Sequence, residues 1–296
     1  MGQSETRFSQ YMFAQGIINP AYNSISEKIN INLITRLQWA NINGAPQVSA
    51  MNLSYPVSRR AAMGVLFLTD RVGVTDTDEL SFTYAYKLPV GKSYAFKTSN
   101  KFISFGLTAG VSFNQLRFSE LVLNDPNDPV FANDLNINSP KFGFGIMYYS
   151  EKMMFGISTP SLTSRQLSSQ NANFRFVNDL SWNGTFQYFF KTNADFGYKA
   201  SMFLRLEEGR PLQVDTNLSL LYKELIWFGV GYSSNNAIIA YIDLKLTSTM
   251  NVSYSMDYLS FQDEFLRNAR GHEIRLAFTI DRFGSRNRGS YSFQVF

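Results

Sequence analysis

The sequence predicts an all-β protein: a single transmembrane, antiparallel, up-and-down β-barrel of about fourteen strands, preceded by an N-terminal periplasmic or lumen-plugging segment. Three observations predict this fold. Apolar and polar residues alternate along most of the chain, and short and long connections alternate between the expected strands. Charged residues are only 17% of the sequence while aromatic residues are 16%, whereas soluble domains usually carry about 25% charged residues.

The alternation is clearest over 102–114, where every odd position from Ile103 to Phe113 is apolar and every even position from Ser104 to Asn114 is small or polar. A period of two residues is that of a β-strand, and this stretch exceeds the roughly five or six residues of a typical soluble strand. Equally regular strands are expected at 29–39, 180–190, 212–220 and 250–258. Weaker copies are expected near 47–56, 61–69, 79–88, 141–149, 152–158, 196–206, 225–233, 237–247 and 272–281.

A large soluble β-sandwich is the alternative fold, because its strands alternate too. Such a sandwich would show shorter strands and a charged solvent face, whereas the polar face here consists mainly of Ser, Gly, Asn, Thr and Gln. Aromatic residues also gather near strand ends, which favours girdles at the two membrane interfaces. The expected girdle residues are Trp39, Tyr55, Tyr148, Tyr149, Tyr188, Phe189, Phe190 and Tyr258.

The connections predict the orientation of the barrel. Those after the odd-numbered strands are expected at 40–46, 70–78, 115–140, 159–175, 207–210, 234–236 and 259–271. Those after the even-numbered strands are mostly tight turns, near 56–60, 89–100, 150–151, 191–195, 222–224 and 247–249. Outer-membrane barrels have short periplasmic turns and longer extracellular loops. We therefore expect both termini in the periplasm and the long loops outside the cell.

The chain divides into three expected regions. Residues 1–27 form a periplasmic or lumen-plugging segment, 28–281 the outer-membrane barrel and 282–296 a periplasmic tail. The first region is rich in aromatic and aliphatic residues, which predicts that it buries surface instead of moving freely.

A barrel of this size has a lumen that wall side chains alone need not fill. Ionisable residues on the predicted inward face are Arg36, Lys87, Lys199, Arg205, Asp215, Asp243, Lys245, Asp257, Glu273 and Arg275. We favour a mixed-sign network that stiffens the wall, and a selective pore is the functional alternative. Pairing depends on strand register, so the sequence leaves both open.

Composition argues against several other classes. The chain has no cysteine and one histidine, and its net charge is +4. We therefore expect no enzyme, no catalytic residues, no metal site, no cofactor and no nucleic-acid partner. Calcium in the loop 124–129, together with Asp134, is the less favoured alternative, because Asn-Asp-Pro is also common turn chemistry.

Several motifs resemble one protein family. FSQYMF at 8–13 and NPAY at 19–22 are followed by RLQW at 36–39 and GAP at 44–46, then by Asp70 and Gly73, and finally by His272-Glu273. Together these resemble the PorP/SprF family of Bacteroidetes outer-membrane proteins. The motif residues are Phe8, Gln10, Tyr11, Phe13, Asn19, Pro20, Ala21, Tyr22, Arg36, Gln38, Trp39, Gly44, Pro46, Asp70, Gly73, His272 and Glu273. For each of them a structural role is favoured over partner contact.

The resemblance implies an outer-membrane component of type IX secretion and gliding. Its expected task is to assist export or surface attachment of a large secreted adhesin with a type B C-terminal domain. Expected partners are this adhesin, outer-membrane lipid, and periplasmic ring proteins and lipoproteins of the system. Members of the family begin with a secretory signal, which the resemblance implies has been removed from this chain. A pore or uptake channel for small solutes or lipids is the alternative function.

Overall fold

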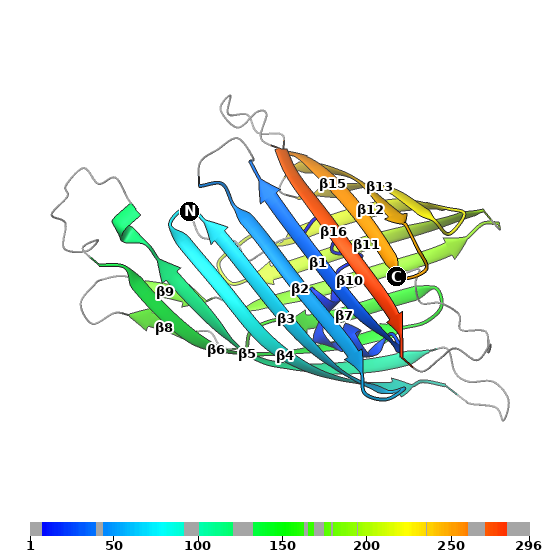
Figure 1. Cartoon of the computed structure of the whole chain (residues 1–296), viewed down its shortest axis with the longest axis horizontal. Coiled ribbons are helices and arrows are strands. Elements are labelled where there is room, and N and C mark those ends of the chain that lie inside the picture. The colour runs from blue at the N-terminus through cyan, green and yellow to red at the C-terminus, as the bar shows by residue number, and fades with distance from the viewer. Residues whose placement is uncertain are drawn as a thin grey trace.

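A computed structural model of the chain describes residues 8–39, 44–91, 101–120, 133–162, 165–168, 175–178, 180–193, 195–234, 236–259 and 270–282. Fourteen antiparallel strands form one closed barrel, which confirms the predicted fold (Figure 1). The barrel strands are β1 (Lys28–Gln38), β2 (Gln47–Pro56), β3 (Ala61–Val72), β4 (Thr75–Pro89), β5 (Phe102–Leu116), β6 (Leu135–Tyr149), β7 (Met153–Thr159), β10 (Ser181–Lys191), β11 (Phe196–Glu207), β12 (Gln213–Tyr222), β13 (Ile226–Ser233), β14 (Ala237–Lys245), β15 (Met250–Leu259) and β16 (Arg270–Asp281).

Each barrel strand pairs with its neighbours in chain order, and β1 pairs with β16 to close the wall. In that seam Lys28 lies opposite Asp281 and Arg36 lies opposite Glu273. A small hairpin, β8 (Arg165–Ser168) with β9 (Arg175–Asn178), lies between β7 and β10 in the chain and projects at the left of Figure 1. Every barrel strand pairs on both sides, although β6 pairs with β7 only over Phe144–Tyr149.

Outward and inward faces of the wall differ as the alternation predicts. Outward side chains are large, apolar and exposed, such as Leu218 at 66% and Leu107 at 64%. Most inward side chains are small or polar and buried, such as Ser104 at 0% and Asn217 at 3%. Lipid can cover the first set, since burial of apolar surface is favourable without any specific partner.

Three short helices complete the described elements: α1 (Gln15–Ile18), the 3₁₀ turn η1 (Pro20–Ser24) and the 3₁₀ turn η2 (Phe118–Glu120). Among the described residues, no helix is both long enough and apolar enough to cross a membrane.

The expected connection at 70–78 is wrong, because β3 continues to Val72 and β4 begins at Thr75. The charged residues in this range led to the prediction of a loop. In the structure they form ion pairs between neighbouring strands: Arg71 contacts Asp78 at 3.0 Å, and Asp76 contacts Arg117 at 2.9 Å. Strands β5 and β6 extend in the same way and shorten the expected connection at 115–140. A two-residue turn joins β3 to β4, and its Gly73 has φ of 57°, which favours glycine.

Candidate functional site

Residues 8–25, which we call the inner segment, lie inside the barrel and contact inward side chains on many strands. Its two ends lie at opposite ends of the barrel. Ile25 lies beside Lys87, near the end of the barrel where the β2–β3 and β4–β5 turns lie, whereas Ser9 and Gln10 lie beside Glu273, three residues from the start of β16. We call these the turn end and the loop end of the barrel. The chain therefore passes through the lumen before β1 begins.

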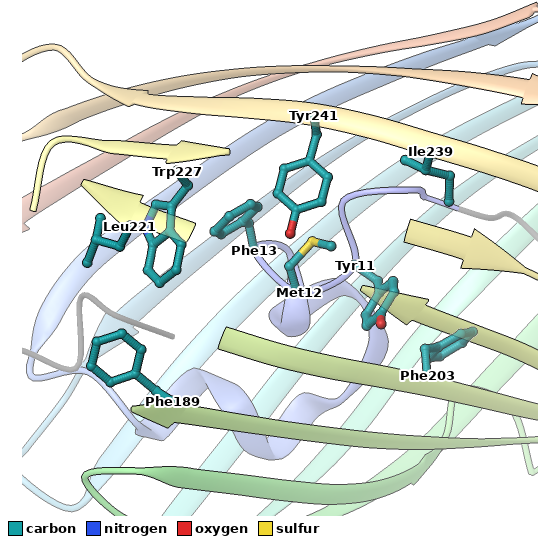
Figure 2. Close-up of a cluster of buried hydrophobic side chains, with 9 residues drawn as sticks. All are labelled: Tyr11, Met12, Phe13, Phe189, Phe203, Leu221, Trp227, Ile239 and Tyr241. Atoms are coloured by element: carbon teal, nitrogen blue, oxygen red, sulfur yellow. The ribbon is translucent and has the colours of Figure 1, made fainter. Parts of the chain in front are cut away.

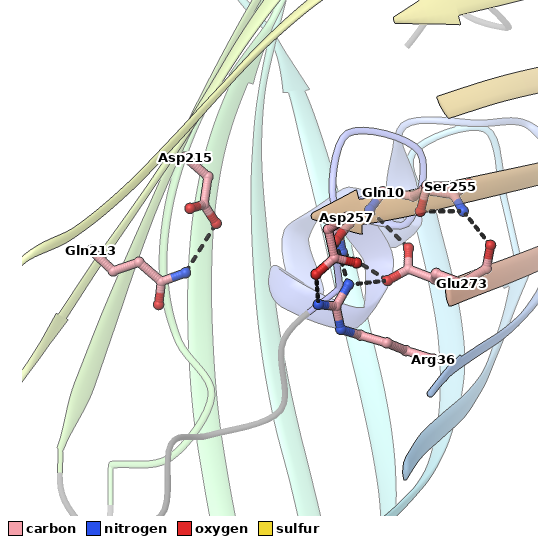
Figure 3. Close-up of polar contacts among 8 residues, drawn as sticks. Gln10, Arg36, Gln213, Asp215, Ser255, Asp257 and Glu273 are labelled. Atoms are coloured by element: carbon pink, nitrogen blue, oxygen red, sulfur yellow. Dashed lines mark hydrogen bonds and ion pairs between the residues drawn. The ribbon is translucent and has the colours of Figure 1, made fainter. Parts of the chain in front are cut away.

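The loop-end anchor consists of Arg36, Asp257 and Glu273 (Figure 3). The Glu273 carboxylate accepts hydrogen bonds from the backbone N–H groups of Ser9 and Gln10, both at 2.8 Å. Arg36 pairs with Asp257 at 2.6 Å and with Glu273 at 3.3 Å, and it also donates to the Ser9 hydroxyl. These three charged side chains are at most 2% exposed, so breaking any one pair leaves a charge buried without its partner.

An aromatic cluster holds the middle of the inner segment (Figure 2). The segment contributes Tyr11, Met12 and Phe13, and the wall contributes Phe189, Phe203, Leu221, Trp227, Ile239 and Tyr241. The ring of Phe13 lies edge-on to that of Tyr241, with centroids 5.8 Å apart. The Lys199 ammonium lies 4.2 Å from the Phe13 ring centroid, a geometry that stabilises a buried cation.

Burial in this cluster has two consequences. Tyr11 is 1% exposed and Met12 is 0% exposed, and each such side chain contributes about 1.5–3 kcal/mol by leaving water. Removal from water also raises the pKa of the Tyr11 phenol above its ordinary value, since the charged form is disfavoured there. The phenol stays protonated and donates to the backbone oxygen of Asp215 at 3.2 Å.

The turn-end dock receives Asn19, Pro20 and Ala21. The Asn19 side chain donates to the backbone oxygens of Ile146 and Ile157, both at 3.3 Å, and accepts from Ala21 N–H at 3.0 Å. The last bond caps η1, as expected of Asn at this position.

Glycines in the wall make room for this dock. A β-carbon at position 106 would overlap the backbone of Pro20 and Ala21, lying 2.7 Å from Ala21 Cα. A β-carbon at Gly145 would lie 2.9 Å from Asn19 Cγ, and one at Gly156 would lie 2.8 Å from Asn19 Nδ2. The small inward residues therefore fit the inner segment, and an empty lumen would not require them.

The ten predicted inward charges take part in several contacts along the wall. Besides the loop-end anchor, Arg275 pairs with Asp243 at 2.9 Å, Lys87 lies 3.9 Å from Glu27, Arg205 donates to Asn183 at 3.2 Å and Gln213 donates to Asp215 at 3.0 Å. Figure 3 shows the last contact apart from the anchor. All ten are buried except Lys245, which is half-buried.

An inward ion pair between Glu79 and Lys141, at 2.6 Å, was not predicted from the sequence. Each of the two residues stands at the first position of an expected strand and on its inward face, and this position was the signal that could have identified them. Three buried residues of the inner segment were not predicted either: Ser9, Gln15 and Asn23. Tyr149 and Phe189 were expected in interfacial girdles, but they face inward with exposed fractions of 1% and 8%.

The motif residues fall into two groups. Phe8, Gln10, Tyr11, Phe13, Asn19, Pro20, Ala21, Tyr22, Arg36 and Glu273 belong to the inner segment or its anchors. Gln38, Trp39, Gly44, Pro46, Asp70, Gly73 and His272 lie toward the loop end, outside the segment's binding sites.

Backbone hydrogen bonds join much of the second group: Gln38 N–H to Pro46 O at 2.9 Å, and Gly73 N–H to Gly44 O at 3.0 Å. His272 faces outward, where its Nδ1 lies 2.7 Å from the Tyr254 hydroxyl.

In the part of the chain that the structure describes, no three His, Cys, Asp or Glu side chains are grouped to hold a metal ion. The loop 124–129, where calcium was the less favoured alternative, lies outside the described residues. Asp134 is described, and it accepts hydrogen bonds from the backbone and hydroxyl of Ser119.

The fold and site define a class: a fourteen-stranded membrane β-barrel whose N-terminal segment lies in its own lumen. The model of the family described as "Type IX secretion system membrane protein PorP/SprF" matches residues 1–278. The chain belongs to this family and is therefore an outer-membrane barrel protein of type IX secretion. The family and the fold are those of secretion and transport membrane proteins. No curated protein matches the sequence significantly.

Two solved barrels resemble the chain. A FadL homologue from Pseudomonas aeruginosa has a TM-score of 0.53 at 10% identity, over 89% of this chain and 92% of that chain. The CymD monoaromatic hydrocarbon channel has a TM-score of 0.54 at 15% identity, over 97% of this chain and 96% of that chain. At these identities the similarity shows the barrel fold alone.

Proposed function

We propose that this barrel assists export or surface attachment of a large secreted adhesin with a type B C-terminal domain. The observation that carries the proposal is the match to the PorP/SprF family over residues 1–278. The position of the inner segment inside the barrel supports a holding role over a conducting one. The inner segment contacts both ends of the barrel and buries Tyr11 and Met12 almost completely.

The loop end is the surface that we assign to the adhesin. We propose that it faces the outside of the cell, in line with the longer connections found there. Its rim carries paired charges of both signs, such as the exposed pair of Arg71 on β3 and Asp78 on β4. Arg117, which directly follows β5, pairs with Asp76. Exposed charged pairs add little affinity but favour correct orientation of a partner.

The turn end is the surface that we assign to periplasmic ring proteins and lipoproteins of the secretion system. Most of its turns are short, and they carry charged residues such as Arg59 and Lys152, both exposed. Lipid of the outer membrane is the proposed partner of the apolar outward face.

A channel for small solutes or lipids is the second candidate. Its support is the fold similarity to the CymD monoaromatic hydrocarbon channel and to the FadL homologue. This function requires the inner segment to leave the lumen or to leave a path beside it. The two candidate functions therefore predict different conductances: none from a complete protein that holds a partner, and an open conductance from a channel.

The decisive experiment is purification of the tagged protein from its own outer membrane in mild detergent, followed by mass spectrometry. We expect a very large secreted protein with a type B C-terminal domain, absent from the untagged strain. The chain has no cysteine, so single cysteines can map the contact. A thiol-reactive crosslinker should reach the adhesin from Glu208→Cys at the loop end, but not from Arg59→Cys at the turn end. A barrel that is repeatedly recovered alone and crosslinks nothing would exclude the proposal.

A further inference from the structure

The inner wall binds the main chain of the inner segment at several points. Glu273 accepts from two successive backbone N–H groups. Side chains from five further strands donate to segment carbonyls: Gln187 to Met12 at 3.2 Å, Ser158 to Ile18 at 2.9 Å, Ser104 to Ala21 at 2.7 Å, Ser54 to Asn23 at 2.8 Å and Lys87 to Ile25 at 3.1 Å. Every peptide offers these backbone groups, so such contacts do not require one particular sequence.

The aromatic cluster adds selection for particular side chains. Phe203 stands 5.4 Å from Tyr11 and Trp227 stands 6.3 Å from Phe13, measured between ring centroids. Lys199 lies between the Phe13 and Trp227 rings, at 4.2 and 4.4 Å from their centroids. Two or three neighbouring aromatic or methionine side chains in a peptide therefore match this part of the wall.

The inner segment does not satisfy all of its own buried polar atoms. Within the described residues, Gln10 Oε1, Gln15 Oε1 and both amide atoms of Asn23 have no hydrogen-bond partner in the protein. Each unpaired buried group weakens the docked state. The segment is nevertheless held because it is tethered to β1, which gives it a high effective concentration at the wall.

We propose that the inner wall is a peptide-binding groove, occupied in cis by residues 8–25, that accepts in trans a peptide carrying neighbouring aromatic or methionine side chains. Such a peptide would enter at the loop end, because Ser9 and Gln10 of the inner segment are bound there by Glu273. This groove deepens the proposed function. It rests on that function only for the identity of the natural peptide, which would be a segment of the secreted adhesin.

The test uses the full-length protein in detergent and a fluorescent synthetic peptide with the sequence of residues 8–25. In the wild type the protein's own residues 8–25, the tethered copy, occupy the groove and should exclude this probe at micromolar concentrations. Phe13→Ala weakens the tethered copy and should raise the probe's affinity roughly 100-fold. Phe228→Ala is the matched control, because Phe228 faces outward and is 46% exposed. It should behave as the wild type does.

A second variant, Asn19→Ala, removes the segment's hydrogen bonds to the backbone oxygens of Ile146 and Ile157 at its other end, so the result does not depend on one substitution. Because the change lies in the segment, it leaves the wall site intact for the probe. A probe with Ser at the positions of Tyr11, Met12 and Phe13 should not bind either variant. The groove is excluded if neither variant binds the probe, or if both bind the serine probe equally well. If the probe experiment fails, the proposal that the loops bind the adhesin still stands. If the purification yields no adhesin, the proposal of a peptide-binding groove still stands.

Discussion

Gly106→Ala tests most sharply whether the wall is shaped for the inner segment. The added β-carbon would lie 2.7 Å from Ala21 Cα and overlap the backbone of Pro20. Backbone atoms in a capped turn cannot rotate away as a side chain can, so the turn must shift. Overpacking of this kind costs about 1–3 kcal/mol. The ratio of docked to undocked segment should therefore fall about 5- to 150-fold.

A buried cysteine reports this ratio. Ala14 is 2% exposed in the inner segment, and Ala14→Cys introduces the chain's one thiol. When docking is fast relative to labelling, the maleimide labelling rate follows the undocked population. Labelling should accelerate about 5- to 150-fold in the Gly106→Ala background.

Gly184→Ala is the control, because its nearest neighbour would be Leu204 Cβ at an ordinary 3.5 Å. The labelling rate in this background should stay within about twofold of that of the Ala14→Cys protein without a second substitution. Substitutions that disturb no packed contact change stability by at most ~0.5 kcal/mol. Circular dichroism should show an intact barrel in both the Gly106→Ala and the Gly184→Ala proteins. Equal labelling rates in the two backgrounds would refute the idea that position 106 is kept small for the segment.

Three further predictions follow from the same contacts. Arg36→Gln leaves Asp257 and Glu273 buried without their cation and should destabilise the barrel by about 3–5 kcal/mol in urea unfolding; an unchanged midpoint would show that the anchor is not buried as described. Phe13→Ala should accelerate labelling of Ala14→Cys far more than Phe228→Ala, because only Phe13 belongs to the buried cluster. In intact cells an impermeant maleimide should label Glu208→Cys but not Arg59→Cys, and the reverse pattern would invert the proposed orientation.

The strands were predictable because lipid imposes a simple rule on them. One face of each strand must be apolar throughout, and residues 102–114 follow that rule without exception. Charged ends of β3 and β4 broke the pattern, because Arg71 and Asp78 lie where a rim ion pair replaces lipid contact. A rule based on hydropathy cannot see such pairing, which depends on register.

The path of the inner segment was not predictable, although a signal for its binding site was present. Phe189, Trp227 and Tyr241 are large aromatic residues on the inward face, where the pattern expects small or polar ones. Such exceptions weaken the alternation, and they mark where the wall binds something apolar. Which apolar segment it binds depends on three-dimensional contacts between residues more than 170 positions apart, as between Gln187 and Met12 with a separation of 175.

Single-channel recording of the full-length protein tests most directly the claim that this barrel holds a partner and is not an open pore. If the inner segment blocks conduction, the complete protein should be silent, and a steady conductance should appear once residues 8–25 are deleted. A stable open conductance from the complete chain, unchanged by that deletion, would contradict the claim and favour a solute channel.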